Sequence, residues 1–293
     1  MIPAHDTIRD VARPSDRISH HWRNSYAHRT VRLAAALWIH FLKRMAGPFQ
    51  AGMARPQASV LTTLCYHSVR KEERDAFEKQ MDLLLECSAA AGTDHGAERY
   101  VHEPGIVVTF DDGFVSITEN ALPVLESRNI PSILFIPTEF IGAKPGWLSG
   151  RCVLDSDQMV MDAAGIRSVS SPLVSIGSHC SRHVALTGLS ENEVLEELHR
   201  SKRILEDITG KPVDLLAFPH GVYNDRIVEL AKQAGYRHAF TLSPVYGARD
   251  ENGFLIRRES VSPRDWILEF YLKIMGDYLW LPYLKRTILR PLW

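Results

Sequence analysis

From Ser59 onward, short apolar runs alternate with segments of helical periodicity, and this alternation constrains the fold more than any other feature of the sequence. The apolar runs predict seven strands, at Val60–Tyr66, Ile106–Phe110, Ser132–Ile136, Leu173–Gly177, Leu215–Phe218, Ala239–Leu242 and Phe254–Arg257. The intervening segments predict helices at Glu72–Ala91, Ile117–Ser127, Glu191–Ile208 and Asp225–Ala234. Repeated strand–helix units are typical of an α/β protein with a parallel sheet, either open or closed into a barrel. In such folds the functional residues follow the carboxyl ends of the strands.

The length of the chain allows one catalytic domain with a further segment at each end. Its 293 residues, 45% of them hydrophobic, suit a domain of about 200–250 residues. We expect a basic N-terminal extension at 1–58, a catalytic domain at 59–262 and an aromatic and basic tail at 263–293. Residues 1–59 hold nine Lys/Arg and three Asp/Glu, so the remainder of a chain with net charge −1 is acidic. An acidic body argues against a nucleic-acid partner, because binding to phosphates needs clustered cations.

The N-terminal extension contains one apolar run, Leu33–Leu42, with basic residues on both sides. Ten residues are too few to cross a bilayer of about 30 Å. A signal peptide would begin nearer the N-terminus and would not include His40. We predict an amphipathic helix that either docks on the domain or lies on a membrane surface. A poorly packed extension and a start of translation at Met45 or Met53 are the alternatives.

The cysteines indicate the cellular compartment of the protein. The chain has four cysteines and no CxxC pair, which is typical of reduced thiols in the cytoplasm. The C-terminal tail is rich in Trp, Tyr and Leu, and it predicts either an interfacial membrane segment or a cap on the open end of the fold. We therefore expect a cytoplasmic protein, with peripheral association to the inner membrane as an option. The sequence does not fix the oligomeric state.

Two adjacent carboxylates, Asp111 and Asp112, follow the apolar strand Ile106–Phe110 and precede Gly113. Neighbouring acids at a strand end repel each other unless one of them binds a cation. Gly113 allows the backbone to turn both side chains toward one site. An Asp-Gly turn or a helix cap is the alternative explanation of this pattern.

A pair of histidines, His179 and His183, follows the predicted strand Leu173–Gly177. Two imidazoles four residues apart can bind one metal ion, and a carboxylate added to them gives a two-His, one-carboxylate set. In a chain with thirteen histidines, surface histidines are the alternative. Because both motifs follow strands of the same parallel sheet, we favour a metal site made from His179, His183 and one carboxylate of the Asp111-Asp112 pair.

Two further motifs follow predicted strands. Phe218-Pro219-His220-Gly221 forms a tight turn whose backbone N–H groups could face a developing oxyanion, and an ordinary strand-to-helix turn is the alternative. Tyr66-His67-Ser68 follows the first strand, where a lone histidine is either structural or catalytic. Besides His67 and His220, we expect four residues of these motifs to contact the substrate, namely Tyr66, Phe218, Pro219 and Gly221.

Together the segments TFDDG, SHCSRH, FPHG and YHSV resemble the NodB-type polysaccharide deacetylases, carbohydrate esterase family 4. The resemblance runs from about Val60 to Arg258. It implies a distorted (β/α)7-type barrel, Asp111 as the general base, and Asp112, His179 and His183 as metal ligands. The opening YHxx strand is similar to the circularly rearranged poly-N-acetylglucosamine deacetylase branch, which implies His67 as the general acid.

The sequence departs from the family pattern at several positions. Ala217 stands where the family has an arginine that orients the base, so another group must do this or the base is less well held. His220 replaces a tyrosine that acts through its backbone N–H, and Cys180 replaces Ser or Thr. The late Leu-x-His motif is missing, with Arg257 where the histidine would be.

These motifs predict a metal-dependent hydrolase, with Zn²⁺ as the expected ion, that removes N-acetyl groups from a glycan or a lipid-linked saccharide. Asp111 would take the proton of the attacking water, the His220 N–H would stabilise the oxyanion, and His67 would protonate the leaving amine. A metal-dependent amidase acting on a non-sugar amide is one alternative. The other is a catalytically weakened relative that binds a glycan or a membrane.

Overall fold

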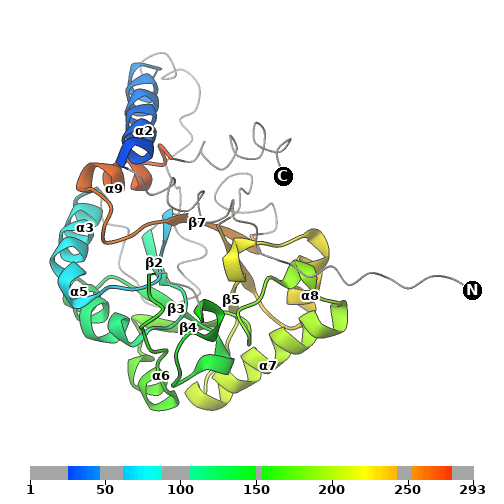
Figure 1. The fold of residues 1–293 in the computed structure, drawn as a ribbon. Helices are drawn as coiled ribbons and strands as arrows, with labels where there is room; N and C mark the ends of the chain where they lie inside the picture. The colour runs from blue at the N-terminus through cyan, green and yellow to red at the C-terminus, as the bar shows by residue number, and fades with distance from the viewer. Residues whose placement is uncertain (1–25, 47–61, 88–105, 150–153, 243–252, 279–293) are drawn as a thin grey trace, which may run out of the picture. The chain divides into compact units, whose positions relative to one another are not determined.

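The computed structural model describes residues 26–46, 62–87, 106–149, 154–242 and 253–278 (Figure 1). The chain divides into two compact units, Met1–Met53 and Ala54–Trp293.

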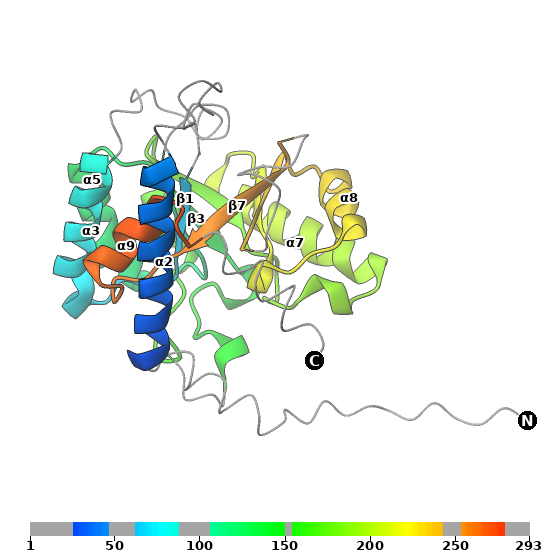
Figure 2. The ribbon, with the colours of Figure 1, turned by 90° about the horizontal axis from the view of Figure 1, so that it is seen from above.

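The second unit contains a closed barrel of seven parallel strands (Figures 1 and 2). The strand order follows the chain, and β7 pairs with β1 to close the barrel. The strands are β1 (Thr62–Tyr66), β2 (Ile106–Phe110), β3 (Ser132–Ile136), β4 (Val174–Ser178), β5 (Leu215–Ala217), β6 (His238–Thr241) and β7 (Leu255–Ser260). This confirms the predicted (β/α)7-type barrel. Because every neighbouring pair is parallel, all seven carboxyl ends lie at the same end of the barrel.

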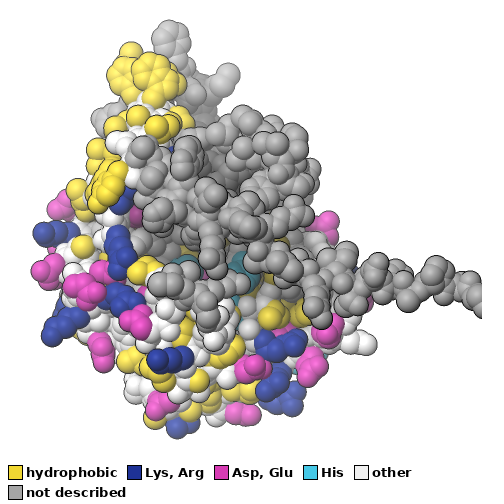
Figure 3. All heavy atoms as spheres, in the orientation of Figure 1, with side chains coloured by type: hydrophobic (Ala, Val, Ile, Leu, Met, Phe, Trp, Pro, Cys, Tyr) yellow, Lys and Arg dark blue, Asp and Glu magenta, His cyan; other side chains and the backbone are white. Residues whose placement is uncertain are grey.

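The described part of the first unit is helix α2 (Tyr26–Ala46), which includes the run Leu33–Leu42 where a helix was expected. Hydrophobic side chains gather along this helix (Figure 3). Within the described ranges, no helix combines the length and the apolar character needed to cross a bilayer.

Helices connect the strands of the barrel, and one more follows the last strand. They are α3 (Arg74–Cys87), α5 (Leu122–Ser127), α6 (Ala163–Val169), α7 (Glu191–Thr209), α8 (Asp225–Gln233) and α9 (Ile267–Ile274), and a π-helical turn, Ile117–Ala121, leads into α5. Figure 2 shows α3 and α5 on one side of the barrel and α7 and α8 on the other. Helix α7 begins with a capping box between Ser190 and Glu193 and ends at Gly210, whose φ of 65° is the left-handed conformation of a helix C-cap.

The predicted elements differ from the observed ones mainly at their ends. Strand β7 continues to Ser260, three residues beyond the predicted end at Arg257. Helices α6 and α9 were not predicted, and α9 buries Phe270 and Ile274 in the main core although it falls in the predicted tail. The predicted segments 60–61, 88–91 and 279–293 lie outside the described residues.

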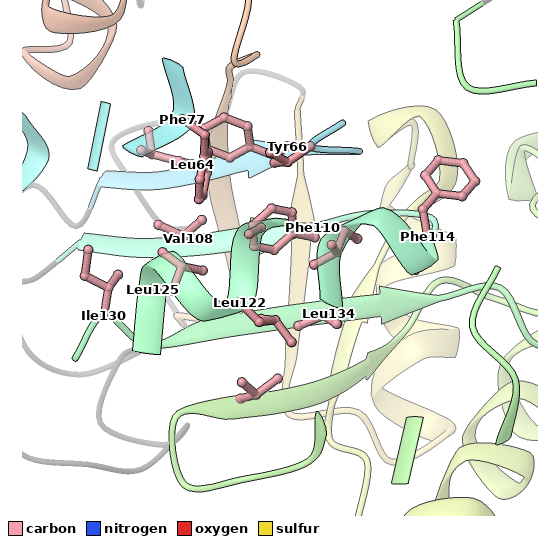
Figure 4. Close-up of a cluster of buried hydrophobic side chains, with 14 of the residues drawn as sticks. Leu64, Tyr66, Phe77, Val108, Phe110, Phe114, Leu122, Leu125, Ile130 and Leu134 are labelled. Atoms are coloured by element: carbon pink, nitrogen blue, oxygen red, sulfur yellow. The ribbon is translucent and has the colours of Figure 1, made fainter. Parts of the chain in front are cut away.

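Side chains alternate along each strand between the two sides of the barrel wall. The outer side packs against the surrounding helices, as Leu64, Tyr66, Val108 and Phe110 show in Figure 4. The inner side carries Val107, Ile133, Phe135, Leu215, Ala217, Phe240 and Ile256, which meet inside the barrel. The barrel therefore has a closed apolar floor beneath its carboxyl end, where the predicted functional residues lie.

Gly177 in β4 is a sensitive position of this interior. A Cβ at Gly177 would lie 2.5 Å from two ring carbons of Phe135 and 3.2 Å from the carbonyl oxygen of Leu215. We expect Gly177→Ala to lower the free energy of unfolding by about 1–3 kcal/mol, because the Phe135 ring must move in a closed interior. Urea denaturation measures the change.

Gly188→Ala is the matched control, since a Cβ there meets nothing within 4 Å. Its free energy of unfolding should stay within about 0.5 kcal/mol of the wild type. Equal stability of the two variants would contradict a tightly packed barrel interior.

Candidate active site

The two carboxylates at the end of β2 turn in different directions. The backbone N–H of Asp111 donates to the carbonyl of Tyr66 at 2.9 Å, so Asp111 still continues the pairing of β2 with β1. Asp112 then adopts a φ of 69° and Gly113 a φ of 63°, both in the left-handed region. A non-glycine residue adopts this conformation at a cost of about 1–3 kcal/mol. The turn separates the surroundings of two side chains that are adjacent in sequence.

The histidines at the end of β4 face Asp112. His179 Nδ1 lies 2.8 Å from the carbonyl oxygen of Ala217, and since a carbonyl only accepts, Nδ1 carries the proton. This leaves the lone pair on Nε2, which lies 3.9 Å from Asp112 Oδ1. His183 Nε2 lies 3.3 Å from the same oxygen. The three residues thus bring one carboxylate oxygen and two imidazole nitrogens within 4.8 Å of one another, an arrangement that could hold a metal ion.

The chemistry of this donor set fits a divalent cation. All three side chains are buried, and Asp112 Oδ1 has no hydrogen-bond partner among the described residues. Burial lowers the pKa of His179 to about 4, so its imidazole is neutral at pH 7. Burial raises the pKa of Asp112, but His183, His67 and His179 together outweigh it and hold that pKa below its usual value. A buried, ionised carboxylate oxygen that accepts no hydrogen bond from the described residues, beside two imidazoles, is a ligand set for a cation.

Arg258 holds Asp111. Its guanidinium donates to both carboxylate oxygens, from Nη1 at 2.6 Å and from Nη2 at 2.8 Å, and Nη1 also donates to Thr109 Oγ1 at 3.2 Å. The Arg258 side chain is fully buried and lies 5.3 Å from the centroid of the Phe135 ring. Burial raises the pKa of Asp111, but the Arg258 guanidinium outweighs it and holds that pKa well below its usual range. Asp111 is therefore ionised and fixed in orientation.

The sequence analysis did not identify Arg258. The family position for the orienting arginine is the last residue of β5, Ala217 here, and the guanidinium comes from β7 instead. The alternation of β7 was the available signal, because Ile256 faces the interior and Arg258, two residues later, faces the same side. The predicted end of the strand at Arg257 concealed it. Arg257, on the opposite side, pairs with Glu259 at 3.3 Å.

His67 lies at the same end of the barrel as the carboxylates. It follows β1 and is exposed. A positive charge on its imidazole would lower the pKa of Asp111 and of Asp112. The exposed His220 adopts a φ of 60°, and its ring centroid lies 4.8 Å from that of His183. The structure thus brings the predicted catalytic residues to the predicted metal site.

The residues expected to contact substrate are placed differently. Tyr66 is fully buried, donates its hydroxyl to Gln80 at 2.8 Å and packs against Phe77, outside the barrel. Phe218 is also fully buried, and its ring stacks on Tyr223. Both side chains point away from the site because their neighbours at the strand ends point toward it, so the expectation for these two residues was wrong.

Pro219 and Gly221 form a buried turn around His220. A Cβ on Gly221, whose φ is 69°, would lie 2.8 Å from the backbone nitrogen of Leu242. These two residues therefore determine the backbone conformation of the turn. Their contact with the substrate stays a prediction.

Trp147 is a second neighbour that the sequence did not reveal. It stacks on the His183 ring with a centroid distance of 4.5 Å and meets Phe140 edge-on at 4.8 Å. A tryptophan held in this way restricts the orientation of His183, which itself has a left-handed φ of 55°.

Glu197 of α7 supports the loop that carries both histidines. Its Oε2 accepts from the backbone N–H of Ser181 at 3.0 Å and of Arg182 at 2.9 Å, and its Oε1 accepts from the Arg182 side chain. The carboxylate is buried, so it accepts hydrogen bonds from N–H groups that water does not reach. Glu197 therefore fixes the backbone between His179 and His183.

Comparisons with known proteins agree with this geometry. A family model described as polysaccharide deacetylase matches residues 98–239, which include both carboxylates and both histidines. The structure of IcaB from Ammonifex degensii superposes with a TM-score of 0.59 and 26% identity, covering 74% of this chain and 98% of that one. The chain belongs to the polysaccharide deacetylase family.

Relatives in sequence and structure extend this result. The Bacillus subtilis protein YxkH is 25% identical over 214 residues, which are 69% of this chain and 72% of YxkH. The poly-beta-1,6-N-acetyl-D-glucosamine N-deacetylase of Staphylococcus aureus is 24% identical over 156 residues, 53% of each protein, so the chain spans about half of that relative. BC0361, a polysaccharide deacetylase from Bacillus cereus, shares the fold with a TM-score of 0.58 and 23% identity over 73% of this chain and 68% of that one.

Removing Glu197 should weaken metal binding by this polysaccharide deacetylase. In Glu197→Ala the N–H groups of Ser181 and Arg182 lose their acceptor, so the loop no longer holds His179 and His183 together. We expect metal affinity to fall by about 10–100-fold. Competition against a chromophoric chelator measures it.

Glu196→Ala is the matched control, because Glu196 is exposed on the same helix turn. It should bind metal as the wild type does. If Glu197→Ala also keeps the wild-type affinity, the support assigned to Glu197 does not exist.

Proposed function

We propose that this polysaccharide deacetylase removes N-acetyl groups from the amino sugars of a glycan or lipid-linked saccharide in a metal-dependent reaction. The observation that carries the proposal is the division of the two carboxylates: Asp111 is held by Arg258, while Asp112 Oδ1 faces His179 and His183 without a hydrogen-bond partner among the described residues. The poly-beta-1,6-N-acetyl-D-glucosamine N-deacetylase relative supports an N-acetylated amino sugar as the substrate class.

Asp112, His179 and His183 are the residues that would hold the cation. Three protein ligands, two imidazoles and a carboxylate, are typical of catalytic Zn²⁺ sites and leave a coordination position open, which supports Zn²⁺ as the ion. When bound, the cation would lower the pKa of a water molecule and polarise the acetyl carbonyl.

The other residues handle protons and developing charge. Asp111 is ionised and oriented by Arg258, so it can accept the proton of the attacking water as the new C–O bond forms. His67, exposed near both carboxylates, would donate the proton that the departing amine needs. The backbone N–H of His220, in the turn beside His183, would stabilise the oxyanion.

The arginine from β7 bears on the alternative of a weakened relative. Two departures from the family pattern favour that alternative: the missing Leu-x-His motif, and Ala217 in place of an arginine that orients the base. Arg258 provides a guanidinium that contacts both oxygens of Asp111, so the base has its orienting partner. The non-sugar amidase alternative uses the same groups and differs only in substrate.

The direct test is acetate release from N-acetylglucosamine oligosaccharides by metal-loaded protein. Asp112→Ala should lose bound metal and at least about 100-fold in turnover, because a ligand of the cation is removed. His67→Ala should keep the metal and lose about 10²–10⁴-fold in turnover, as expected of a general acid. Metal analysis of each variant separates the two effects.

Asp157→Ala, at an exposed acid paired with Arg70, is the control and should turn over normally. Normal turnover by Asp112→Ala would refute the ligand assignment. Acetate release from simple acetamides but not from the oligosaccharides would favour the amidase.

Replacing Arg258 should shift the pH dependence of the reaction. Without the guanidinium, burial raises the pKa of Asp111 and the largest opposing contribution is lost. Asp111 must be ionised to act as a base, so the acidic limb of the kcat/KM profile should move to higher pH in Arg258→Met. Arg258→Lys keeps the charge but not the two-point contact, and it should give a smaller shift with a lower kcat.

Arg258→Met leaves a carboxylate buried without its partner, which costs about 3–5 kcal/mol of stability. Where it does not fold, Arg258→Lys carries the test. A wild-type acidic limb together with a wild-type kcat in Arg258→Lys would mean that Arg258 does not set the state of Asp111.

A further inference from the structure

Helix α2 has one apolar face. Its exposed large apolar side chains are Tyr26, Val31, Leu37, Trp38, Phe41, Leu42 and Met45. At about 100° per residue, these seven positions fall within an arc of about 160° around the helix axis. Trp38 is 63% exposed and Phe41 53%, and their rings stack with a centroid distance of 6.0 Å. Figure 3 shows the hydrophobic side chains along the helix.

All formal charges of α2 are positive. Tyr26–Ala46 contains Arg29, Arg32, Lys43 and Arg44, and neither Asp nor Glu. By the same periodicity, Arg29 and Arg32 fall on the side of the helix opposite the apolar face. Such a helix, apolar and aromatic on one face and basic on the other, is typical of segments that lie in the plane of a membrane interface.

We propose that α2 binds flat on the surface of an anionic lipid bilayer, with the aromatic face inserted at the headgroup level. Trp and Tyr favour this depth, since their rings are amphipathic. The four cations complement anionic headgroups. A bilayer also fits better than a second copy of the chain, because anionic headgroups supply counter-charges for the cations of α2, whereas a second α2 contains neither Asp nor Glu.

The proposal is independent of the proposed deacetylase activity. The helix belongs to the unit Met1–Met53, whereas the candidate active site lies in Ala54–Trp293. Acetate release from a soluble oligosaccharide can therefore be measured separately from binding to lipid.

Co-sedimentation of the full chain with vesicles tests the proposal. Binding to vesicles containing phosphatidylglycerol should be at least about tenfold stronger than to phosphatidylcholine alone, and it should weaken as salt is added. The double variant Trp38→Glu/Phe41→Glu should bind at least about tenfold more weakly, because two aromatic side chains are no longer transferred from water into the bilayer. Arg29→Gln/Arg32→Gln should bind about 25-fold more weakly, about fivefold for each cation.

Leu85→Glu is the matched control, because Leu85 is an exposed apolar residue on α3. It should bind both vesicles as the wild type does, and all variants should show wild-type circular dichroism. If the aromatic variant does not fold, the arginine variant and the salt dependence carry the test.

Three results would overturn the proposal. The first is a wild-type chain that sediments with neither vesicle. The second is wild-type binding by both the aromatic and the arginine variants. The third is a wild-type dimer that Trp38→Glu converts to a monomer without any change in vesicle binding, which would assign the apolar face to a second copy.

Discussion

Asp111 carries its charge inside a barrel lined mainly by Val, Ile, Leu and Phe side chains, and Arg258 is the group that stabilises that charge. Two hydrogen bonds of 2.6 and 2.8 Å join the guanidinium to both carboxylate oxygens. Removing either partner of a buried pair leaves a charge that costs about 3–5 kcal/mol. The pair also links β7 to the end of β2, the two strands that flank β1, so the state of the candidate base depends on closure of the barrel. Thr109, on the inner side of β2, completes the contact.

The backbone at the site is held in conformations that L-residues rarely adopt. Asp112, His183 and His220 all have left-handed φ values, and each belongs to the proposed catalytic set. Such residues persist where surrounding contacts compensate for their strain. Glu197 provides these contacts for the histidine loop through two backbone N–H groups, and Trp147 stacks on His183. The division between Asp111 and Asp112 depends on this backbone geometry.

The strand ends were predictable because apolar runs of four to eight residues stop where polar motifs begin, and parallel pairing places all such ends together. That reasoning located the carboxylates and the histidines correctly. It could not decide which side of the barrel wall a residue at a strand end faces, and Tyr66 and Phe218 face the outer core. It also missed Arg258, because a guanidinium two strands away from the expected position becomes visible only when the strand register is known. Local pattern thus predicts the positions of the strand ends, while the contacts around them depend on tertiary structure.

The central claim is that two adjacent carboxylates have different roles, and metal titration of Asp111→Asn and Asp112→Asn tests it most directly. Asp112→Asn should bind Zn²⁺ at least about 100-fold more weakly than the wild type, because a charged ligand is lost. Asp111→Asn should keep its affinity within about tenfold, since both carboxylate oxygens of Asp111 accept hydrogen bonds from Arg258. Equal losses in the two variants, or a larger loss in Asp111→Asn, would contradict the division of roles.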